Sequence, residues 1–168
     1  MSIEKELRIM HACELGAVGV YRGHKCVARY FFRANLSDLD NMRFHEKDHA
    51  SIFSNLLKER GARFCFAHQL FFIGGLFYGV IVGLLGIKAI GTSTYTIEKI
   101  VNEEFELALP KLESDSSICT KIKAIQLEEQ QHRDSGKELA GNNYTLFGVV
   151  ERIAKTGAYT AKYLASSL

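Results

Sequence analysis

Residues 39–56 read LDNMRFHEKDHASIFSNL, and two polar residues, Glu46 and His49, lie on the apolar stripe of this predicted helix. The apolar residues recur at steps of three and four, which is typical of an α-helix with one buried face. Residues three apart on a helix point the same way, so Glu46 and His49 can bind one metal ion together. The stretch therefore predicts a helix that carries a metal-binding pair into a protein core.

The same E-x-x-H pair recurs at Glu129 and His132. Random placement of the 14 glutamates and 6 histidines among 168 residues would give about 0.5 such pairs, so two pairs alone are weak evidence. A single glutamate precedes each pair: Glu14 lies 32 residues before Glu46, and Glu98 lies 31 residues before Glu129. That separation is the length of one long helix plus a turn, which brings antiparallel neighbours level. Two single glutamates and two Glu-x-x-His pairs form the ligand set of di-iron and di-manganese helical bundles.

The predicted apolar surroundings of these residues support a metal site. A single inward glutamate is more often salt-bridged, and a lone core histidine is usually only hydrogen-bonded. Four carboxylates that face one core need compensating charge, because burying each unpaired one costs several kcal/mol. Two divalent cations would balance them, and a mixed carboxylate and imidazole set favours iron or manganese. The six predicted ligands are Glu14, Glu46, His49, Glu98, Glu129 and His132.

The whole chain, residues 1–168, predicts a single all-α domain with a ferritin-like four-helix bundle core and additional membrane-facing helices. Six helical stretches are expected, at about 3–33, 37–61, 64–87, 89–112, 118–139 and 145–165. Ser37 is expected to cap the second helix, and Pro110 to bend or end the fourth. The sequence Gly141-Asn142-Asn143 is expected to break the chain before the last helix.

Charge and cysteine content narrow the partners and the compartment. A net charge of +2 gives no indication of a nucleic-acid partner. The four cysteines are scattered without C-x-x-C spacing and are expected to be reduced thiols, as in a cytosol-like compartment. The first eight residues carry charges and lack the apolar region of a secretory signal.

Residues 70–87 contain no charged side chain and meet the length criterion for a membrane span. A helix that crossed the membrane here would put the two halves of the metal site on opposite sides of the bilayer. We therefore predict a helix inserted in the membrane interface. Burial of the helix in the bundle is the alternative. The residues expected to meet lipid are Phe71, Phe72, Phe77 and Tyr78. Those expected to allow close approach of another helix are Gly75, Gly79 and Gly83. The cations expected to face anionic headgroups are Arg60, Arg63 and Lys88.

The sequence HACELGA at residues 11–17 resembles the H-A-G-E-x-G-A opening of the demethoxyubiquinone hydroxylases. The resemblance continues through residues 46–49, the glycine-rich apolar helix, residues 97–98 and residues 128–136, almost to the end of the chain. It implies a di-iron monooxygenase of ubiquinone biosynthesis that hydroxylates the ring of a prenylated demethoxy-benzoquinone or quinol. Two Fe²⁺ ions per chain, O₂ as co-substrate and an external two-electron reductant such as NADH follow from it. By motif match the six residues are the ligands, and His11 and Asp134 are expected to orient them.

The resemblance also implies a location and partners. We expect a peripheral protein on the cytoplasmic face of a bacterial inner membrane, or on the matrix face of the mitochondrial inner membrane. The membrane surface and a prenylated quinone are the expected partners. A lipid-binding accessory protein of ubiquinone biosynthesis and a homo-oligomer remain open.

Two features depart from the family pattern. Cys13 stands where the family has glycine, which adds bulk beside the first ligand. Residues 103–105, Glu-Glu-Phe, align with a family His-His-Tyr, so a histidine and a phenol that could relay protons or electrons are missing. This puts the reduction route in doubt and leaves metal binding unaffected. Two other functions stay open: a rubrerythrin-like peroxidase or iron store, which the apolar helix disfavours, and a non-catalytic quinone-binding scaffold, which residues 103–105 suggest.

Overall fold

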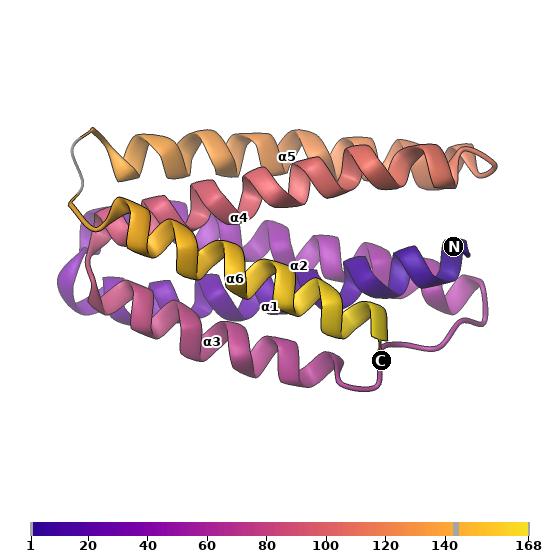
Figure 1. Ribbon diagram of the computed structural model, residues 1–168, viewed down its shortest axis with the longest axis horizontal. Coiled ribbons are helices and arrows are strands. Elements are labelled where there is room, and N and C mark those ends of the chain that lie inside the picture. Colours follow the sequence, from indigo (N-terminus) through magenta and orange to yellow (C-terminus); the bar gives the residue numbers. More distant parts are fainter. Residues whose placement is uncertain (1, 143–144, 168) are drawn as a thin grey trace.

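The computed structural model describes residues 2–142 and 145–167, so Asn143 of the predicted break lies outside the described residues. Within these ranges the protein contains helices and no strand (Figure 1). The six α-helices are α1 (Ile3–Phe31), α2 (Leu36–Glu59), α3 (His68–Leu84), α4 (Ile87–Ala108), α5 (Ser116–Ala140) and α6 (Phe147–Ser167). Two 3₁₀ turns, η1 (Arg33–Asn35) and η2 (Leu109–Leu112), join α1 to α2 and α4 to α5. The all-α prediction is confirmed.

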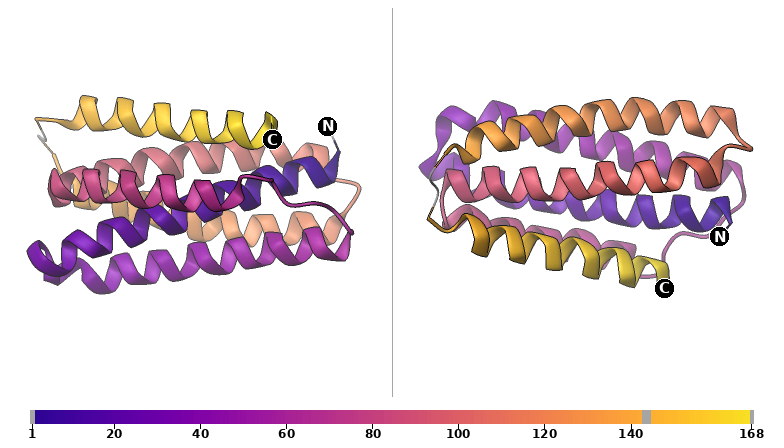
Figure 2. Two further views of the ribbon diagram at one scale, coloured as in Figure 1. Left: turned by 90° about the horizontal axis from the view of Figure 1, so that it is seen from below. Right: turned by 45° about the horizontal axis from the view of Figure 1, so that its top comes forward.

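Two helical hairpins form the four-helix core. In one, α1 packs against α2, and in the other α4 packs against α5, while α2 meets α5 across the bundle. The remaining helices lie outside this core: α3 packs along α1, and α6 packs on both α1 and α4 (Figures 1 and 2). The two hairpins correspond to the two sequence halves that each carry a single glutamate and an E-x-x-H pair.

The core contains two apolar layers with polar side chains between them. One layer includes Leu7, Phe53 and Ile122, which come from three different core helices. The other includes Leu39 of α2 and Ile90 of α4, toward the opposite end of the bundle. Each fully buried large side chain contributes about 1.5–3 kcal/mol, so these layers hold the bundle together on both sides of the polar region.

Glycines bring α3 close to α1, as predicted. A Cβ atom on Gly75 would lie 2.1 Å from the carbonyl oxygen of Gly16, and one on Gly79 would lie 2.1 Å from that of Val20. Real Cβ atoms do not approach backbone oxygens so closely. The α1–α3 contact is therefore made backbone to backbone and requires glycine at these positions.

The helix ends confirm one predicted boundary and correct another. Pro110 lies in η2, and α4 ends at Ala108, as expected for a residue that cannot continue a helix. Ser37, in contrast, lies inside α2 and does not cap it, because η1 continues directly into the helix and places Asn35 at the cap position. At the start of α5 the side chain of Asp115 accepts a hydrogen bond from the backbone N–H of Ile118, at 3.1 Å.

α3 exposes one apolar stripe, but only part of it was predicted correctly. No helix in residues 2–142 and 145–167 combines the length and the apolar character needed to cross a membrane. The exposed large residues of α3 recur at helical steps and are Leu70, Ile73, Phe77, Ile81 and Leu84. Phe71 and Phe72 are half-buried, and Tyr78 turns inward to a hydrogen bond of 2.8 Å with Ser93. Of the four residues expected to meet lipid, only Phe77 belongs to the exposed stripe.

Candidate metal centre

The four core helices bring all six predicted ligands into the polar region between the two apolar layers. α1 supplies Glu14, α4 supplies Glu98, and the two E-x-x-H pairs come from α2 and α5. Every one of the six is at most 4% exposed. The periodicity explains this placement, because each ligand lies on the same stripe as the apolar residues of its helix.

The six residues form two overlapping groups of potential ligand atoms. Glu14, Glu46, His49 and Glu129 offer one set, in which the atoms lie within 4.8 Å of one another. The second set, at the same spacing, consists of Glu46, Glu98, Glu129 and His132. Glu46 and Glu129 belong to both, so each carboxylate can be shared by two ions. Each group contains three carboxylates and one imidazole.

The Nδ1 atoms of both histidines face the shared carboxylates. Nδ1 of His132 lies 3.1 Å from Oε1 of Glu46 and 3.0 Å from Oε2 of Glu129. Nδ1 of His49 lies 2.8 Å from Oε1 of Glu129 and 4.0 Å from Oε2 of Glu46. Nδ1 is therefore the nitrogen that each ring offers to a metal ion.

Burial and mutual repulsion disfavour the ionised form of three carboxyl groups. Burial raises the pKa of Glu46 and that of Glu98 well above the ordinary value, and the negative charge of Glu129 adds to both shifts. Burial and the same charge raise the pKa of Glu14 to about 7. The centre thus holds more negative charge than the fold can accommodate without protons or cations.

The remaining carboxylate is stabilised by the two histidines. Burial alone would raise the pKa of Glu129, but the contacts with His132 and His49 hold it at about 2. Burial likewise would lower the pKa of His49, yet Glu129 and Glu14 raise it to about 9. A positive charge beside Glu129 is therefore favourable, which is the condition that a metal ion would satisfy.

Several buried atoms of the centre lack a hydrogen-bond partner among the described residues. They are both carboxylate oxygens of Glu46, Nδ1 of His49 and Oε1 of Glu129. The last two atoms lie 2.8 Å from each other, but their orientation does not allow a hydrogen bond. Leaving a buried polar atom unpaired costs about 1–3 kcal/mol, so such atoms are normally satisfied. Unpaired donor atoms that face a common space fit metal ligation, and this donor set suits iron or manganese.

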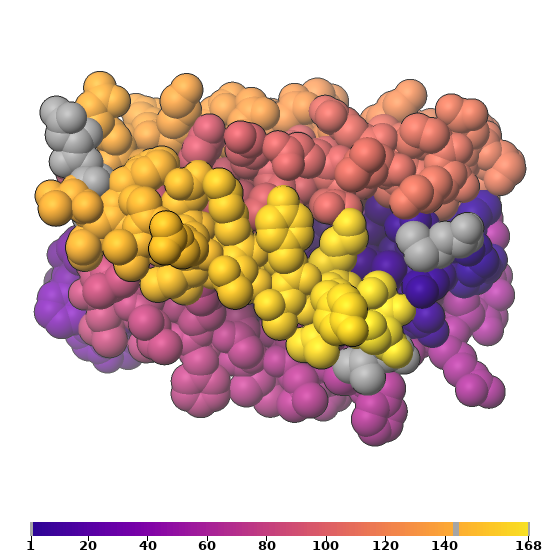
Figure 3. Space-filling view, viewed as in Figure 1, coloured from indigo at the N-terminus to yellow at the C-terminus, as the bar shows by residue number. Residues whose placement is uncertain are grey.

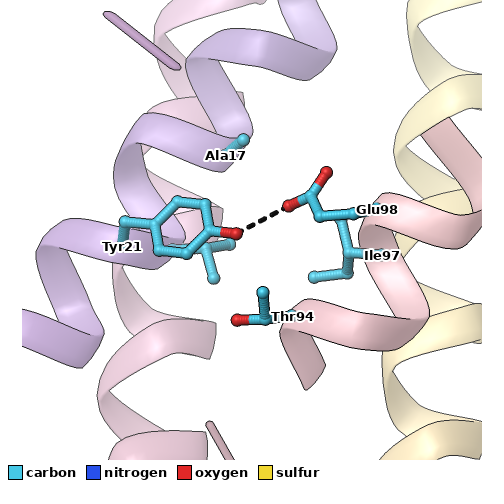
Figure 4. Close-up of a pocket in the computed structure, with 6 residues that line it drawn as sticks. Ala17, Tyr21, Thr94, Ile97 and Glu98 are labelled. Carbon is cyan, nitrogen blue, oxygen red and sulfur yellow. Dashed lines mark hydrogen bonds between the residues drawn. The ribbon is translucent and has the colours of Figure 1, made fainter. Parts of the chain in front are cut away.

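Three side chains beyond the ligands contact the centre, and the sequence did not assign them. Tyr21 donates its phenolic O–H to Oε1 of Glu98 at 2.7 Å, and a small void of about 10 Å³ between α1 and α4 adjoins this pair (Figure 4). Oε2 of Glu128 lies 2.8 Å from Nε2 of His49. Nδ1 of His45 lies 3.0 Å from Nε2 of His132. A recognisable signal is that His45 and Glu128 each directly precede the glutamate of an E-x-x-H pair.

The two residues expected to orient ligands do not do so in the structure. The side chain of Asp134 is 65% exposed and pairs with Arg133 at 2.8 Å, so this expectation is wrong. His11 is buried beside the rings of Phe64 and His68, and its Nδ1 has no partner among the described residues. Burial lowers the pKa of His11 to about 4, which keeps its ring neutral.

The departures from the family pattern lie partly against α6 and partly in the apolar core. Glu104 forms an ion pair with Lys162 of α6, while Phe105 is buried in the apolar layer. Cys13 packs with Cys65 and the C-terminal part of α6. Burial and the charge of Glu14 raise the pKa of the Cys13 thiol to about 12, so it stays protonated.

Comparison with known proteins identifies relatives along nearly the whole chain. The family model described as "Ubiquinone biosynthesis protein COQ7" matches residues 1–165. A Rhodospirillum rubrum protein named 3-demethoxyubiquinol 3-hydroxylase is 30% identical over 160 residues, which cover 95% of this chain and 75% of the relative. A Dictyostelium discoideum protein named NADPH-dependent 3-demethoxyubiquinone 3-hydroxylase, mitochondrial, is 25% identical and covers 98% of this chain and 76% of its own length. A Caenorhabditis elegans protein of the same name is also 25% identical, with coverages of 99% and 90%.

Proposed function

The chain belongs to the family of the ubiquinone biosynthesis protein COQ7, and from this premise we propose that it hydroxylates the ring of a prenylated demethoxyubiquinol at a di-iron centre. The observation that carries the proposal is the buried cluster of four carboxylates and two imidazoles, in which two carboxylates are common to both ligand groups. The proposed ligands are Glu14, Glu46, His49, Glu98, Glu129 and His132. A pair of Fe²⁺ ions bound there would supply the O₂ activation that ring hydroxylation requires.

The protein's own groups hold this centre and keep water out. Glu46 and Glu129 would each bind both ions, while Glu14 and Glu98 would each bind one. The hydroxyl of Tyr21 fixes one oxygen of Glu98, so this carboxylate keeps a single orientation. The apolar layers on both sides exclude water, which strengthens every charge interaction between them. Since the two eukaryotic relatives above are named NADPH-dependent, we propose a reduced pyridine nucleotide as the electron source.

The exposed apolar residues of α3 and α6 support attachment to a membrane surface. Both helices lie on the same face of the molecule (Figure 3). α6 also exposes large apolar residues, namely Val149, Ile153, Tyr159, Tyr163 and Leu164. Exposed apolar residues on two neighbouring helices suit a membrane interface. Arg63 and Lys88 are exposed near the ends of α3 and suit anionic headgroups, whereas Arg60 is paired with Glu4 and Asp115.

This surface also suits a substrate with a long prenyl tail. The tail would stay in the bilayer while the ring approaches the centre between α1 and α4, the helices that carry Glu14 and Glu98. α6 covers this region from outside, since it packs on both helices. We therefore propose a peripheral membrane protein, on the cytoplasmic or the matrix face. An accessory lipid-binding protein and a homo-oligomer remain predictions.

Anaerobic purification with iron, followed by iron analysis and a demethoxyquinol hydroxylation assay, tests the proposal. About two irons per chain and quinol hydroxylation are expected. Glu129→Gln should abolish turnover and iron loading while the helical circular dichroism signal is retained. Glu138→Gln is the matched control, because Glu138 is exposed on the same helix. Full turnover in the Glu129 variant would refute the site assignment.

The same assay separates the alternatives. A non-catalytic scaffold is favoured by one observation, the absence of a phenol at Phe105, and it would retain bound quinone without iron. A rubrerythrin-like enzyme would bind iron and consume peroxide without acting on the quinol.

A further inference from the structure

Each ligand histidine has an outer partner, and the two partners occupy equivalent sequence positions. Glu128, which precedes Glu129 on α5, reaches across to Nε2 of His49 on α2, at 2.8 Å. His45, which precedes Glu46 on α2, reaches across to Nε2 of His132 on α5, at 3.0 Å. The arrangement is reciprocal between the two helices, but one partner is a carboxylate and the other an imidazole.

The contact between His45 and His132 is an in-plane hydrogen bond. The ring centroids are 5.2 Å apart and the ring planes differ by 16°. Face-to-face rings with nitrogens only 3.0 Å apart would have much closer centroids. Two nearly coplanar rings that meet edge to edge account for both values, so the lone pair of one nitrogen lies in line with the N–H of the other.

The direction of this bond follows from the ligand role of His132. Its Nδ1 faces Glu46 and Glu129 and must present a lone pair to bind a metal ion. The proton of the neutral ring therefore resides on Nε2, which donates to Nδ1 of His45. His45 must accept at Nδ1, where Oε2 of Glu128 lies 3.9 Å away, beyond hydrogen-bond distance. Its side chain is 39% exposed and can direct Nε2–H to solvent.

We propose that His45 is a positioning residue, which fixes the ring and tautomer of His132, and that the metal position at His132 is the weaker of the two. This rests on the proposed two-metal site. A carboxylate partner makes a ligating imidazole a stronger donor than a neutral partner does, so Glu128 favours the position at His49. The Tyr21 hydrogen bond acts in the same direction, because it withdraws charge from Glu98, which is a ligand only at the His132 position.

Anaerobic titration of the metal-free protein with Co²⁺, followed by absorption and calorimetry, tests this. We expect two binding steps of unequal affinity in the native protein. His45→Leu removes the acceptor and should weaken only the second step, by about 10-fold or more. His45→Asn should restore much of the affinity, because its amide oxygen lies near the position of imidazole Nδ1. Glu128→Gln should weaken the first step. Phe44→Ala is the control, since Phe44 is an exposed neighbour on α2.

The outcomes separate this inference from the function on which it rests. Selective weakening of the second step by His45→Leu, with rescue by His45→Asn and unchanged melting of the metal-free variants, supports it. Equal weakening of both steps, no weakening, or no rescue overturns it while the metal centre stands. Failure of the native protein to bind Co²⁺ overturns both.

Discussion

The α1–α3 contact makes a quantitative prediction about two glycines of one helix. Gly79→Ala places a methyl group 2.1 Å from the carbonyl oxygen of Val20 and 2.9 Å from its carbonyl carbon. Gly74→Ala, five residues earlier, meets no described atom within 4 Å apart from its chain neighbours and the nearby backbone of α3. Both changes give α3 the same gain in helix propensity, about 1 kcal/mol. The difference between the two variants therefore measures the contact alone.

The size of that difference follows from the geometry. The atoms that a methyl group at residue 79 would meet belong to backbone, so they cannot move aside as a flexible side chain can. α3 must shift outward by roughly 1 Å or more, which opens the contact along its length. Overpacking of this kind costs about 1–3 kcal/mol and occasionally more. We expect Gly79→Ala to lower the free energy of unfolding by about 2 kcal/mol, with the gain in helix propensity already included. Gly74→Ala should stabilise by up to about 1 kcal/mol.

Thermal unfolding of the two variants by circular dichroism, in the same detergent, measures this. For a chain of this size 1 kcal/mol corresponds to about 2–4 °C, so the two melting temperatures should differ by about 6–12 °C. Equal melting temperatures would show that α3 does not pack on α1 through its glycines and would refute the reasoning.

Three further predictions concern buried polar groups. Burial lowers the pKa of His24 to about 3, so its ring stays neutral in the folded state, whereas in the unfolded state it gains a proton below pH 6.5. The free energy of unfolding of the metal-free protein, measured in urea, should therefore fall by about 2 kcal/mol from this group between pH 7.5 and 5. His24→Leu should remove that part of the pH dependence. Tyr21→Phe leaves Glu98 without its donor and should cost about 1–2 kcal/mol in the same assay; no change would show that the hydrogen bond contributes nothing. Co²⁺ binding at pH 7 should release protons, because His49, whose pKa is raised to about 9, holds one when no metal is present, and the raised pKa of Glu46 and of Glu98 favours their protonated forms. Calorimetry in buffers of different ionisation enthalpy counts these protons, and a release near zero would contradict the charge state described here.

The sequence was sufficient to predict which six buried side chains come together, because helical periodicity determines which side chains of a helix share a face. Glu46 and His49 must point the same way on any α-helix, and the matched offset to a preceding glutamate requires only two helices of ordinary length. Their outer partners could not be found in this way. The contact of Glu128 with His49 depends on the register between α2 and α5, which results from side-chain packing and not from spacing within either helix.

The faces of α3 were harder to predict for a different reason. Its sequence is apolar all round, so no periodic contrast indicates which residues face α1 and which face outward. The glycine positions identify the packed face correctly, and the residues on the opposite side, such as Ile73 and Ile81, are the exposed ones. Phe71 and Phe72 were expected to meet lipid, but they flank the glycine face and are half-buried.

The ion pair between Glu104 and Lys162 explains how the chain tolerates its departure from the family near the metal centre. A glutamate in place of histidine adds a negative charge to α4, the helix that also carries Glu98. The ammonium group of Lys162 lies against this added carboxylate and compensates it locally. The proposed charge balance of four carboxylates, two cations and two neutral imidazoles is then unchanged, so we expect metal binding to be independent of the substitution. The phenol is still missing at Phe105, and we therefore expect the departure to affect proton or electron delivery.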